Sequence, residues 1–322
     1  MKCLILAAGY ATRLYPLTEN FPKPLLDVGG KTILDWLIED LDATGAIDEY
    51  IVVTNHKFAE IFREWAELRC GLFYAESPIG ETSASLHPSH NFPSKNCGPL
   101  PFKRPRAATV SPTELSAYDR NAEGQAISSK CETGVEQSLR QRITVLDDGT
   151  STNEGRLGAV KDIQFAIEQL GIDDDLLVMA GDNLLTFSLG PYIEYFKQKG
   201  TSCVMRYYEP ELAKLRKTGV LQIDEQDRIV AMEEKPSEPR SHWCCPPFYI
   251  YKREDLARVT EGIAAGCGTD APGSFIAWLC TKSPVHAWPM PGQRIDIGSL
   301  ESYEEAKRTY NNESRLRGSR EQ

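Results

Sequence analysis

Hydrophobic positions in the first seventy residues follow two alternating spacings. Residues 2–7 form a short continuous apolar run, which is typical of a strand buried on both faces. Within 32–44 the apolar side chains recur at helical spacing, and Thr32 is placed to cap that helix. The run at 50–55 predicts a second strand, and the apolar stripe in 57–69 predicts a second helix. The order is therefore strand, helix, strand, helix.

The same alternation resumes near residue 143. The predicted strands are 143–146, 176–180, 202–208, 219–223, 228–232, 243–251 and 285–288, and the predicted helices are 157–170, 190–199, 254–265, 274–280 and 301–310. Alternating strands and helices favour a layered α/β domain. We expect a three-layer α/β/α, Rossmann-like fold with a mixed, mostly parallel sheet and helices on both faces.

Residues 70–141 break this pattern. Ten of these 72 residues are serine, seven are proline, and only 12 are Leu, Ile, Val or Phe. That apolar share lies below the level at which chains usually fold alone, and so long a loop is unusual inside a compact domain. We therefore expect a low-complexity, disordered insert, with a small independent module as the alternative. Residues 1–69 plus 142–310 then form one domain, and 311–322 form a polar tail.

Composition narrows the functional classes. The chain is 41% hydrophobic and 25% charged, and it has no apolar run near the 18 residues that a membrane span needs. Its net charge of −10 disfavours nucleic acid as a partner, so an anionic ligand must meet a local cluster of basic residues. Nine cysteines without a C-x-x-C spacing argue against a disulfide framework or a zinc site and favour the cytoplasm.

The loop after the first strand is the first candidate binding site. Its small residues let backbone N–H groups approach a ligand, and the carboxyl end of a buried strand is where α/β sheets bind ligands. Its spacing matches neither a dinucleotide fingerprint nor a Walker A loop. Arg13 adds a guanidinium suited to bidentate phosphate contact. The predicted nucleotide-binding residues of this loop are Leu6, Ala8, Gly9, Tyr10, Ala11 and Thr12; a plain tight turn is the alternative.

Lys23 is the second candidate. Pro22 and Pro24 restrict the backbone on both sides of it, so the direction of the chain at this lysine is set in advance. A preset lysine suits a triphosphate. A solvated lysine in a stiff surface loop is the alternative.

These motifs together resemble a known family. The run Leu6-Ala-Ala-Gly-x-x-Thr-Arg-Leu-x-Pro-Leu-Thr-x-x-x-Pro-Lys-Pro-Leu-Leu-x-Val-x-Gly-Lys-x-Ile-Leu34 closely resembles the N-terminal signature of sugar-phosphate nucleotidyltransferases, which include glucose-1-phosphate thymidylyltransferases and uridylyltransferases. The resemblance continues through Gly181-Asp-Asn183, Glu233-Glu-Lys-Pro236 and Asp296-Ile-Gly298. It implies a nucleotide-diphospho-sugar transferase fold and a Mg²⁺-dependent enzyme. Such an enzyme moves a nucleoside monophosphate from an NTP to a sugar 1-phosphate or related phosphorylated alcohol and releases pyrophosphate.

The resemblance also implies roles for single residues. Asp182 and Asp296 are similar to the family's metal ligands. The family's catalytic groups are matched by Arg13, Lys23 and Asp182. Asn153 and Gly155 lie where the family reads the nucleobase edge. Gly219, Glu234 and Lys235 are similar to the family's acceptor-binding residues. By this resemblance Glu234 accepts hydrogen bonds from sugar-like hydroxyls, and Lys235 binds the acceptor phosphate. Strand alternation predicts that residues 233 and 235 share one face and that 234 lies on the other.

The transfer reaction explains why such a site needs positively charged groups. A phosphate monoester carries close to two negative charges at pH 7, so the attacking oxygen is already ionised and no general base is needed. The obstacle is repulsion between two polyanions, which amounts to roughly 4 kcal/mol per charge pair at 4 Å and an effective dielectric of 20. Positioning and cation clamping must supply the catalysis. The candidate clamps are Arg13, Lys23, Lys235 and Mg²⁺.

Two departures from the family pattern bear on specificity. Ala11 stands where the family usually has glycine. Pro246 and Pro247 interrupt the segment expected to offer a glycine beside the sugar, and they remove backbone donors. The acceptor could therefore be a smaller or non-sugar phosphate.

Two rival functions share this pattern. A glycosyltransferase of related fold would consume a nucleotide-sugar and would not depend on free NTP. A catalytically inactive regulatory homologue would bind sugar nucleotides without turnover. The partners expected for the nucleotidyltransferase are an NTP and a phosphorylated sugar or polyol, with no nucleic acid and no membrane, and homo-oligomerisation is left open.

Overall fold

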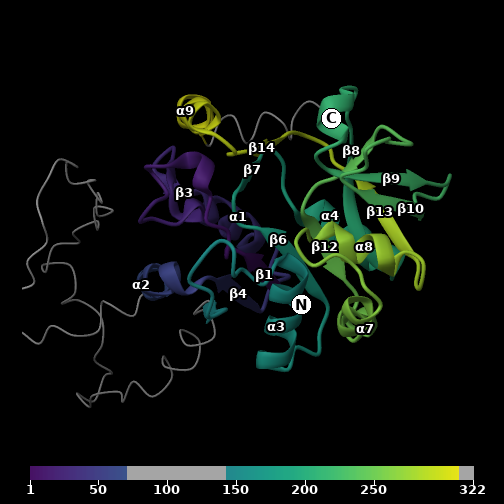
Figure 1. The fold of residues 1–322 in the computed structure, drawn as a ribbon, viewed down its shortest axis with the longest axis horizontal. Coiled ribbons are helices and arrows are strands. Elements are labelled where there is room, and N and C mark those ends of the chain that lie inside the picture. Colours follow the sequence, from purple (N-terminus) through teal and green to yellow (C-terminus); the bar gives the residue numbers. More distant parts are fainter. Residues whose placement is uncertain (71–142, 312–322) are drawn as a thin grey trace, which may run out of the picture. The chain divides into compact units, whose positions relative to one another are not determined.

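A ten-stranded mixed sheet forms the centre of the computed structural model, which describes residues 1–70 and 143–311 (Figure 1). Nearly all of the predicted 70–141 insert and of the 311–322 tail lies outside the described residues, so the proposed domain division stays a prediction. The strands of the sheet are β1 (Lys2–Leu6), β4 (Glu49–Thr54), β5 (Ile143–Asp147), β6 (Leu176–Ala180), β8 (Ser202–Tyr208), β9 (Gly219–Ile223), β10 (Ile229–Glu234), β11 (Trp243–Cys245), β12 (Phe248–Tyr251) and β13 (Val285–Pro289).

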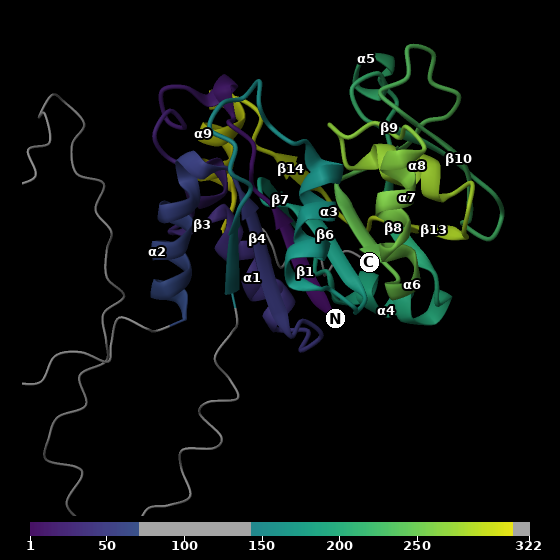
Figure 2. The same ribbon diagram turned by 60° about the horizontal axis from the view of Figure 1, so that its bottom comes forward.

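The strand order is β10-β9-β11-β8-β12-β6-β1-β4-β5, and β13 pairs with β8. Strands β6, β1, β4 and β5 pair in parallel and lie side by side (Figure 2), as do β8 and β13. The remaining pairs are antiparallel. The predicted mixed α/β sheet is confirmed, although its parallel part is smaller than the sequence pattern suggests.

Helices cover both faces of this sheet, because side chains of the central strands point alternately to two cores. In β1, Cys3 and Ile5 face one core and Leu4 faces the other. Helices α1 (Ile33–Asp42), α2 (Ala59–Arg69) and α4 (Gly190–Lys199) pack on the first face, and α3 (Ala159–Leu170), α7 (Arg258–Ala264) and α8 (Gly273–Leu279) pack on the second.

Thr32 caps α1 as predicted, since its hydroxyl accepts a hydrogen bond from the Asp35 backbone N–H at 3.0 Å. A smaller apolar cluster lies beside this helix, where α9 (Leu300–Thr309) packs against a short hairpin. The short elements that the hydrophobic pattern did not predict are β2 (Asp27–Val28), β3 (Lys31–Thr32), β7 (Asn183–Leu185), β14 (Arg294–Asp296) and α5 (Leu212–Leu215). The predicted 254–265 helix is divided into α6 (Arg253–Leu256) and α7, and α9 closes the described chain as expected.

The predicted 243–251 strand is divided in two. Pro246 and Pro247 separate β11 from β12, and both pieces pair antiparallel with β8. The interrupted segment is bonded to the central sheet: the Pro247 carbonyl accepts a hydrogen bond from the Ala180 N–H at the end of β6 (3.1 Å). The two prolines therefore turn this segment toward the carboxyl ends of the central strands.

None of the helices within residues 1–70 and 143–311 is long and apolar enough to cross a bilayer.

Candidate active site

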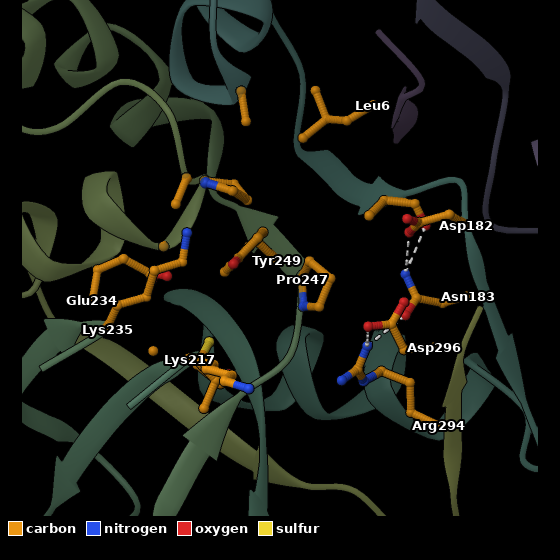
Figure 3. Close-up of a pocket in the computed structure, with 18 of the residues that line it drawn as sticks. Leu6, Asp182, Asn183, Lys217, Glu234, Lys235, Pro247, Tyr249, Arg294 and Asp296 are labelled. Atoms are coloured by element: carbon orange, nitrogen blue, oxygen red, sulfur yellow. Dashed lines mark hydrogen bonds and ion pairs between the residues drawn. The ribbon is translucent and has the colours of Figure 1, made fainter. Parts of the chain in front are cut away.

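A cavity of about 540 Å³ opens at the carboxyl ends of β1 and β6, where Leu6 and Ala180 line it. This is the edge at which parallel α/β sheets bind ligands. Figure 3 shows Asp182, Asn183, Arg294 and Asp296 at one end of the cavity and Glu234, Lys235 and Lys217 at the other, with Pro247 and Tyr249 between them. We call these the carboxylate end and the lysine end.

Lys23 joins the two aspartates of the carboxylate end. Its Nζ lies 2.7 Å from Asp182 Oδ2 and 3.7 Å from Asp296 Oδ1. Asp182 is the second residue after the end of β6, and β14 pairs with β7 so that Asp296 is opposite Asn183. Lys23 is 7% exposed and does not line the cavity. Its charge therefore supports the carboxylates from behind.

Arg294 completes this end and was not predicted from the sequence. Its Nη1 donates to Asn183 Oδ1 at 2.6 Å and lies 4.0 Å from Asp296 Oδ2. Arg294 and Asp296 are two residues apart in β14, so both side chains lie on the same face of the strand. The two-residue spacing between Arg294 and Asp296 was a sequence signal that they share a face, but only if residues 294–296 form a strand. The hydrophobic pattern did not predict that strand.

The carboxylate end has the chemistry that a magnesium ion requires. Mg²⁺ takes oxygen ligands and is typically held by one or two carboxylates together with substrate phosphates and water. Asp182 and Asp296 are both partly exposed at the cavity wall, and Lys23 holds them near one another. Within residues 1–70 and 143–311 no cluster of three or more His, Cys, Asp or Glu side chains could hold a metal. The donor set thus fits an ion shared with phosphate rather than a closed protein cage.

The N-terminal loop brings Arg13 to the same end. A Cβ placed on Gly298 would lie 3.8 Å from both Arg13 Nη2 and Asp296 Oδ2, so guanidinium and carboxylate flank one glycine. Just before Arg13, Ala11 has φ 45° and ψ 40°, the left-handed region that favours glycine. This conformation explains why glycine is usual at the position and why alanine there strains the loop.

Of the predicted nucleotide-loop residues, Leu6 lines the cavity, whereas Ala8, Gly9, Tyr10, Ala11 and Thr12 do not. The Ala8 carbonyl accepts from Asn55 Nδ2 at 3.0 Å, and the buried Tyr10 donates its hydroxyl hydrogen to the Thr150 carbonyl at 3.2 Å. Gly9 faces open space, and Thr12 begins a short 3-10 turn. These contacts fix the shape of the loop and leave its backbone as the part available to a ligand.

Asn153 and Gly155 lie in the loop before α3, also outside the cavity lining. The Gly155 N–H donates to Thr152 Oγ1 at 3.1 Å, which closes a turn. Asn153 Oδ1 accepts from Arg156 Nη1 at 3.1 Å, and Arg156 Nη2 donates to Asp270 Oδ1 at 2.6 Å. The loop of the predicted base-reading residues is therefore tied to Asp270, which does line the cavity.

Glu234 is the central group of the lysine end. Its carboxylate has no hydrogen-bond or ion-pair partner within the part of the chain that the structure describes. Burial raises the pKa of Glu234; Lys235 opposes that rise and Asp270 adds to it. A Cβ on Gly219 would lie 3.0 Å from Glu234 Oε2, and a Cβ on Gly273 only 2.2 Å away. A Cβ at either position would therefore displace this carboxylate.

Lys235 corrects the predicted face assignment. Alternation predicted that residues 233 and 235 share one face, but β10 ends at Glu234 and Lys235 has φ 50°. The left-handed residue redirects the chain, so Glu234 and Lys235 both line the cavity while Glu233 lies 3.8 Å from Arg240. Such conformations cost about 1–3 kcal/mol and cluster at functional sites.

Several lining residues come from segments in which the sequence showed no motif. They are Tyr207, Lys214, Lys217, Thr218, Asp270 and Gly273, whereas Cys245, Pro247 and Tyr249 come from the segment that the two prolines interrupt. Cys245 and Tyr249 are buried, and burial raises the pKa of both well above the ordinary range, so neither is a nucleophile here. The Asp270-Ala-Pro-Gly273 turn was the one local signal that could have been followed.

Comparisons with known proteins identify the family and agree with the fold. The nucleotidyl transferase family matches residues 2–85 and 118–313 of the sequence. The fold is similar to UDP-glucose pyrophosphorylase complexed with UDP-glucose (TM-score 0.64, 18% identity, covering 96% of this chain and 97% of that one) and to its apo form (0.65, 17%, 96% and 97%). It is also similar to a Bacillus anthracis protein assigned as a glucose-1-phosphate thymidylyltransferase, in complex with sucrose (0.59, 18%, 96% and 94%). The chain belongs to the nucleotidyl transferase family.

Proposed function

We propose that this protein transfers a nucleoside monophosphate from an NTP to a sugar 1-phosphate or related phosphorylated alcohol and releases pyrophosphate. One observation carries the proposal. A single cavity has Lys23-linked carboxylates and Arg13 at one end and a free carboxylate beside lysines at the other. Five basic and four acidic side chains line it in a chain of net charge −10, so it is locally attractive to phosphates.

The reaction needs two anions to be held in line. An ionised oxygen of the acceptor phosphate attacks the α-phosphorus, a new P–O bond forms, and the bond to the β-phosphate oxygen breaks as pyrophosphate leaves. Arg13 and the backbone of residues 8–11 bind the triphosphate. The acceptor lies at the lysine end, with Lys235 on its phosphate and Glu234 accepting hydrogen bonds from its hydroxyls. These groups orient the reactants and reduce the repulsion between them.

Asp182 and Asp296 are the residues that would hold Mg²⁺. When bound, the ion would neutralise charge on the phosphates in the transition state. Lys23 holds the two carboxylates near one another, and its positive charge supports them from outside the cavity lining. The family resemblance and the donor set support this metal.

A pyrophosphate-release assay tests the proposal directly. The full chain is incubated with each of the common NTPs and a panel of phosphorylated sugars and polyols, with Mg²⁺ or with EDTA. We expect release with one restricted NTP and acceptor combination, and no release with EDTA. Release of free nucleoside diphosphate from a nucleotide-sugar would instead identify a glycosyltransferase. Nucleotide-sugar binding without any turnover would identify the regulatory homologue.

A further inference from the structure

Two lysines at the same end of the cavity differ in whether their charge is compensated. Lys214 lies 2.8 Å from Glu211 Oε1 and 4.0 Å from Glu209 Oε2. Lys217, three residues later, also lines the cavity, but no carboxylate of the described residues forms an ion pair with it. The positive charge of Lys217 is therefore available to a ligand.

The fold keeps Lys217 beside Lys235. The Lys235 N–H donates to the carbonyl of Thr218 at 3.0 Å, and Glu234 is paired with Gly219 across β9 and β10. The two lysines consequently enter the cavity from the ends of neighbouring strands. Figure 3 shows both on the side that holds Glu234. Lys235 likewise has no carboxylate partner among residues 1–70 and 143–311.

The two positive charges of Lys217 and Lys235 are complementary to an anion that carries two negative charges. A phosphate monoester carries close to two negative charges at pH 7, because its second pKa is about 6. Lys235 alone would leave about one of those charges unmatched. A carboxylate or a phosphodiester carries a single charge and would leave one lysine unmatched.

We propose that Lys217 is a second ligand of the acceptor phosphate and that, together with Lys235, it selects acceptors bearing a dianionic phosphoryl group. The inference rests on the proposed function only in placing the acceptor at this end. Lys217 determines charge preference, whereas Glu234 meets the remainder of the acceptor. Ammonium groups suit this role because they bind phosphate as mobile point charges.

Binding of simple anions tests this without turnover. Isothermal titration calorimetry on the full chain compares sulfate, a tetrahedral dianion, with methyl sulfate, its monoanionic counterpart. We expect the wild type to bind sulfate more tightly, and we expect K217M to lose about fivefold to tenfold in sulfate affinity while changing little toward methyl sulfate. K217R should retain most of the sulfate affinity.

Three variants locate the effect. R216M removes the same charge from the adjacent residue, which does not line the cavity, and should bind sulfate like the wild type. K217M should cause the same loss of sulfate affinity when it is added to R13M as when it is added to the wild type, whereas K235M combined with K217M should lose less than the sum of the single losses because one anion bridges both lysines. Equal sulfate affinity in K217M and R216M, or no sulfate binding by the wild type, would overturn the proposal.

Catalysis then separates the two proposals. If pyrophosphate release is found, K217M should raise the acceptor KM about fivefold to tenfold with the NTP KM unchanged. An unchanged acceptor KM would overturn the role of Lys217 and leave the reaction intact. Sulfate binding that depends on Lys217 in a protein without any turnover would overturn the reaction and leave the anion site intact.

Discussion

The carboxylate end and the lysine end of the cavity hold their charges in different ways. At the carboxylate end, Lys23 is within ion-pair distance of both Asp182 and Asp296, and Arg294 is bonded to Asn183. At the lysine end, Glu234 and Lys235 have no such partners in the described parts of the chain. The first end is organised before any ligand arrives, whereas the second is completed by its ligand.

This difference separates catalysis from recognition. Preorganised charges act on the transition state without further rearrangement, which is the most effective form of electrostatic catalysis. Uncompensated charges cost stability in the free protein, and the cost is recovered only when a complementary ligand binds. We therefore expect changes at the carboxylate end to lower kcat and changes at the lysine end to raise the acceptor KM.

The largest expected effect is that of D182N. Removing one carboxylate charge should lower pyrophosphate release by about 10²–10³-fold, because a preorganised electrostatic group is lost. Circular dichroism should show that the variant is folded. D173N is the matched control, since Asp173 is an exposed partner of Arg253 that does not line the cavity. Near-normal turnover by D182N would contradict the assignment of catalysis to the carboxylate end.

K23M should lower stability as well as activity. It leaves two neighbouring carboxylates without their shared cation, and breaking a buried pair costs about 3–5 kcal/mol. Because both aspartates are partly exposed, we expect a loss nearer 2 kcal/mol in the free energy of unfolding, measured by urea denaturation. Combining K23M with D182N should recover part of the loss. A double variant as unstable as the sum of its parts would show that Lys23 is not coupled to Asp182.

E234Q should affect recognition rather than folding. We expect the acceptor KM to rise about tenfold, since a charged acceptor of hydrogen bonds is lost, with kcat within about threefold. E233Q, on the same strand but outside the cavity lining, should leave the KM unchanged. A collapse of kcat with an unchanged acceptor KM would place Glu234 in the catalytic machinery and break the comparison.

The pH dependence of stability gives a second readout for this variant. The folded-state pKa of Glu234 is raised by burial, so the wild type carries a penalty above that pKa that E234Q lacks. E234Q should therefore be the more stable protein at pH 7. Its advantage should shrink as the pH falls through the folded pKa and vanish below the ordinary value of about 4.5. Thermal melts between pH 4 and 8 measure this, and a constant difference would contradict it.

A11G should have the smallest effect. Alanine in the left-handed conformation costs about 1 kcal/mol, part of which glycine returns as chain entropy, so we expect a gain of about 0.5 kcal/mol. A8G, in the same loop at a position with negative φ, should lower stability instead. Thermal melts compare the two, and NTP KM values within twofold of the wild type would indicate that the strain is not needed for binding.

Strands and candidate site residues could be predicted from the sequence where they lie within one continuous stretch of the chain. Buried strands read as apolar runs, and Arg13, Lys23 and Asp182 lie in contiguous motifs next to such strands. Arg294 and Lys217 were missed because each reaches the cavity only through pairings made between distant segments. The face of Lys235 was predicted wrongly because a single left-handed residue ends the alternation, and apolar spacing carries no information on φ.

The loop between α7 and α8 contacts both the segment that follows the predicted base-reading residues and the lysine end of the cavity. The Thr269 and Asp270 carbonyls accept from the first turn of α3, Gly158 leaves no space for a Cβ beside Thr269, and Arg156 reaches Asp270. At its other end the same loop reaches Gly273, which packs against Glu234. One loop therefore supports both the predicted base-reading segment and the proposed acceptor site. If residues 153–156 select the base, we expect that a change of base preference there would also alter the preference for the acceptor, and that exchanging this loop between relatives would transfer both preferences together.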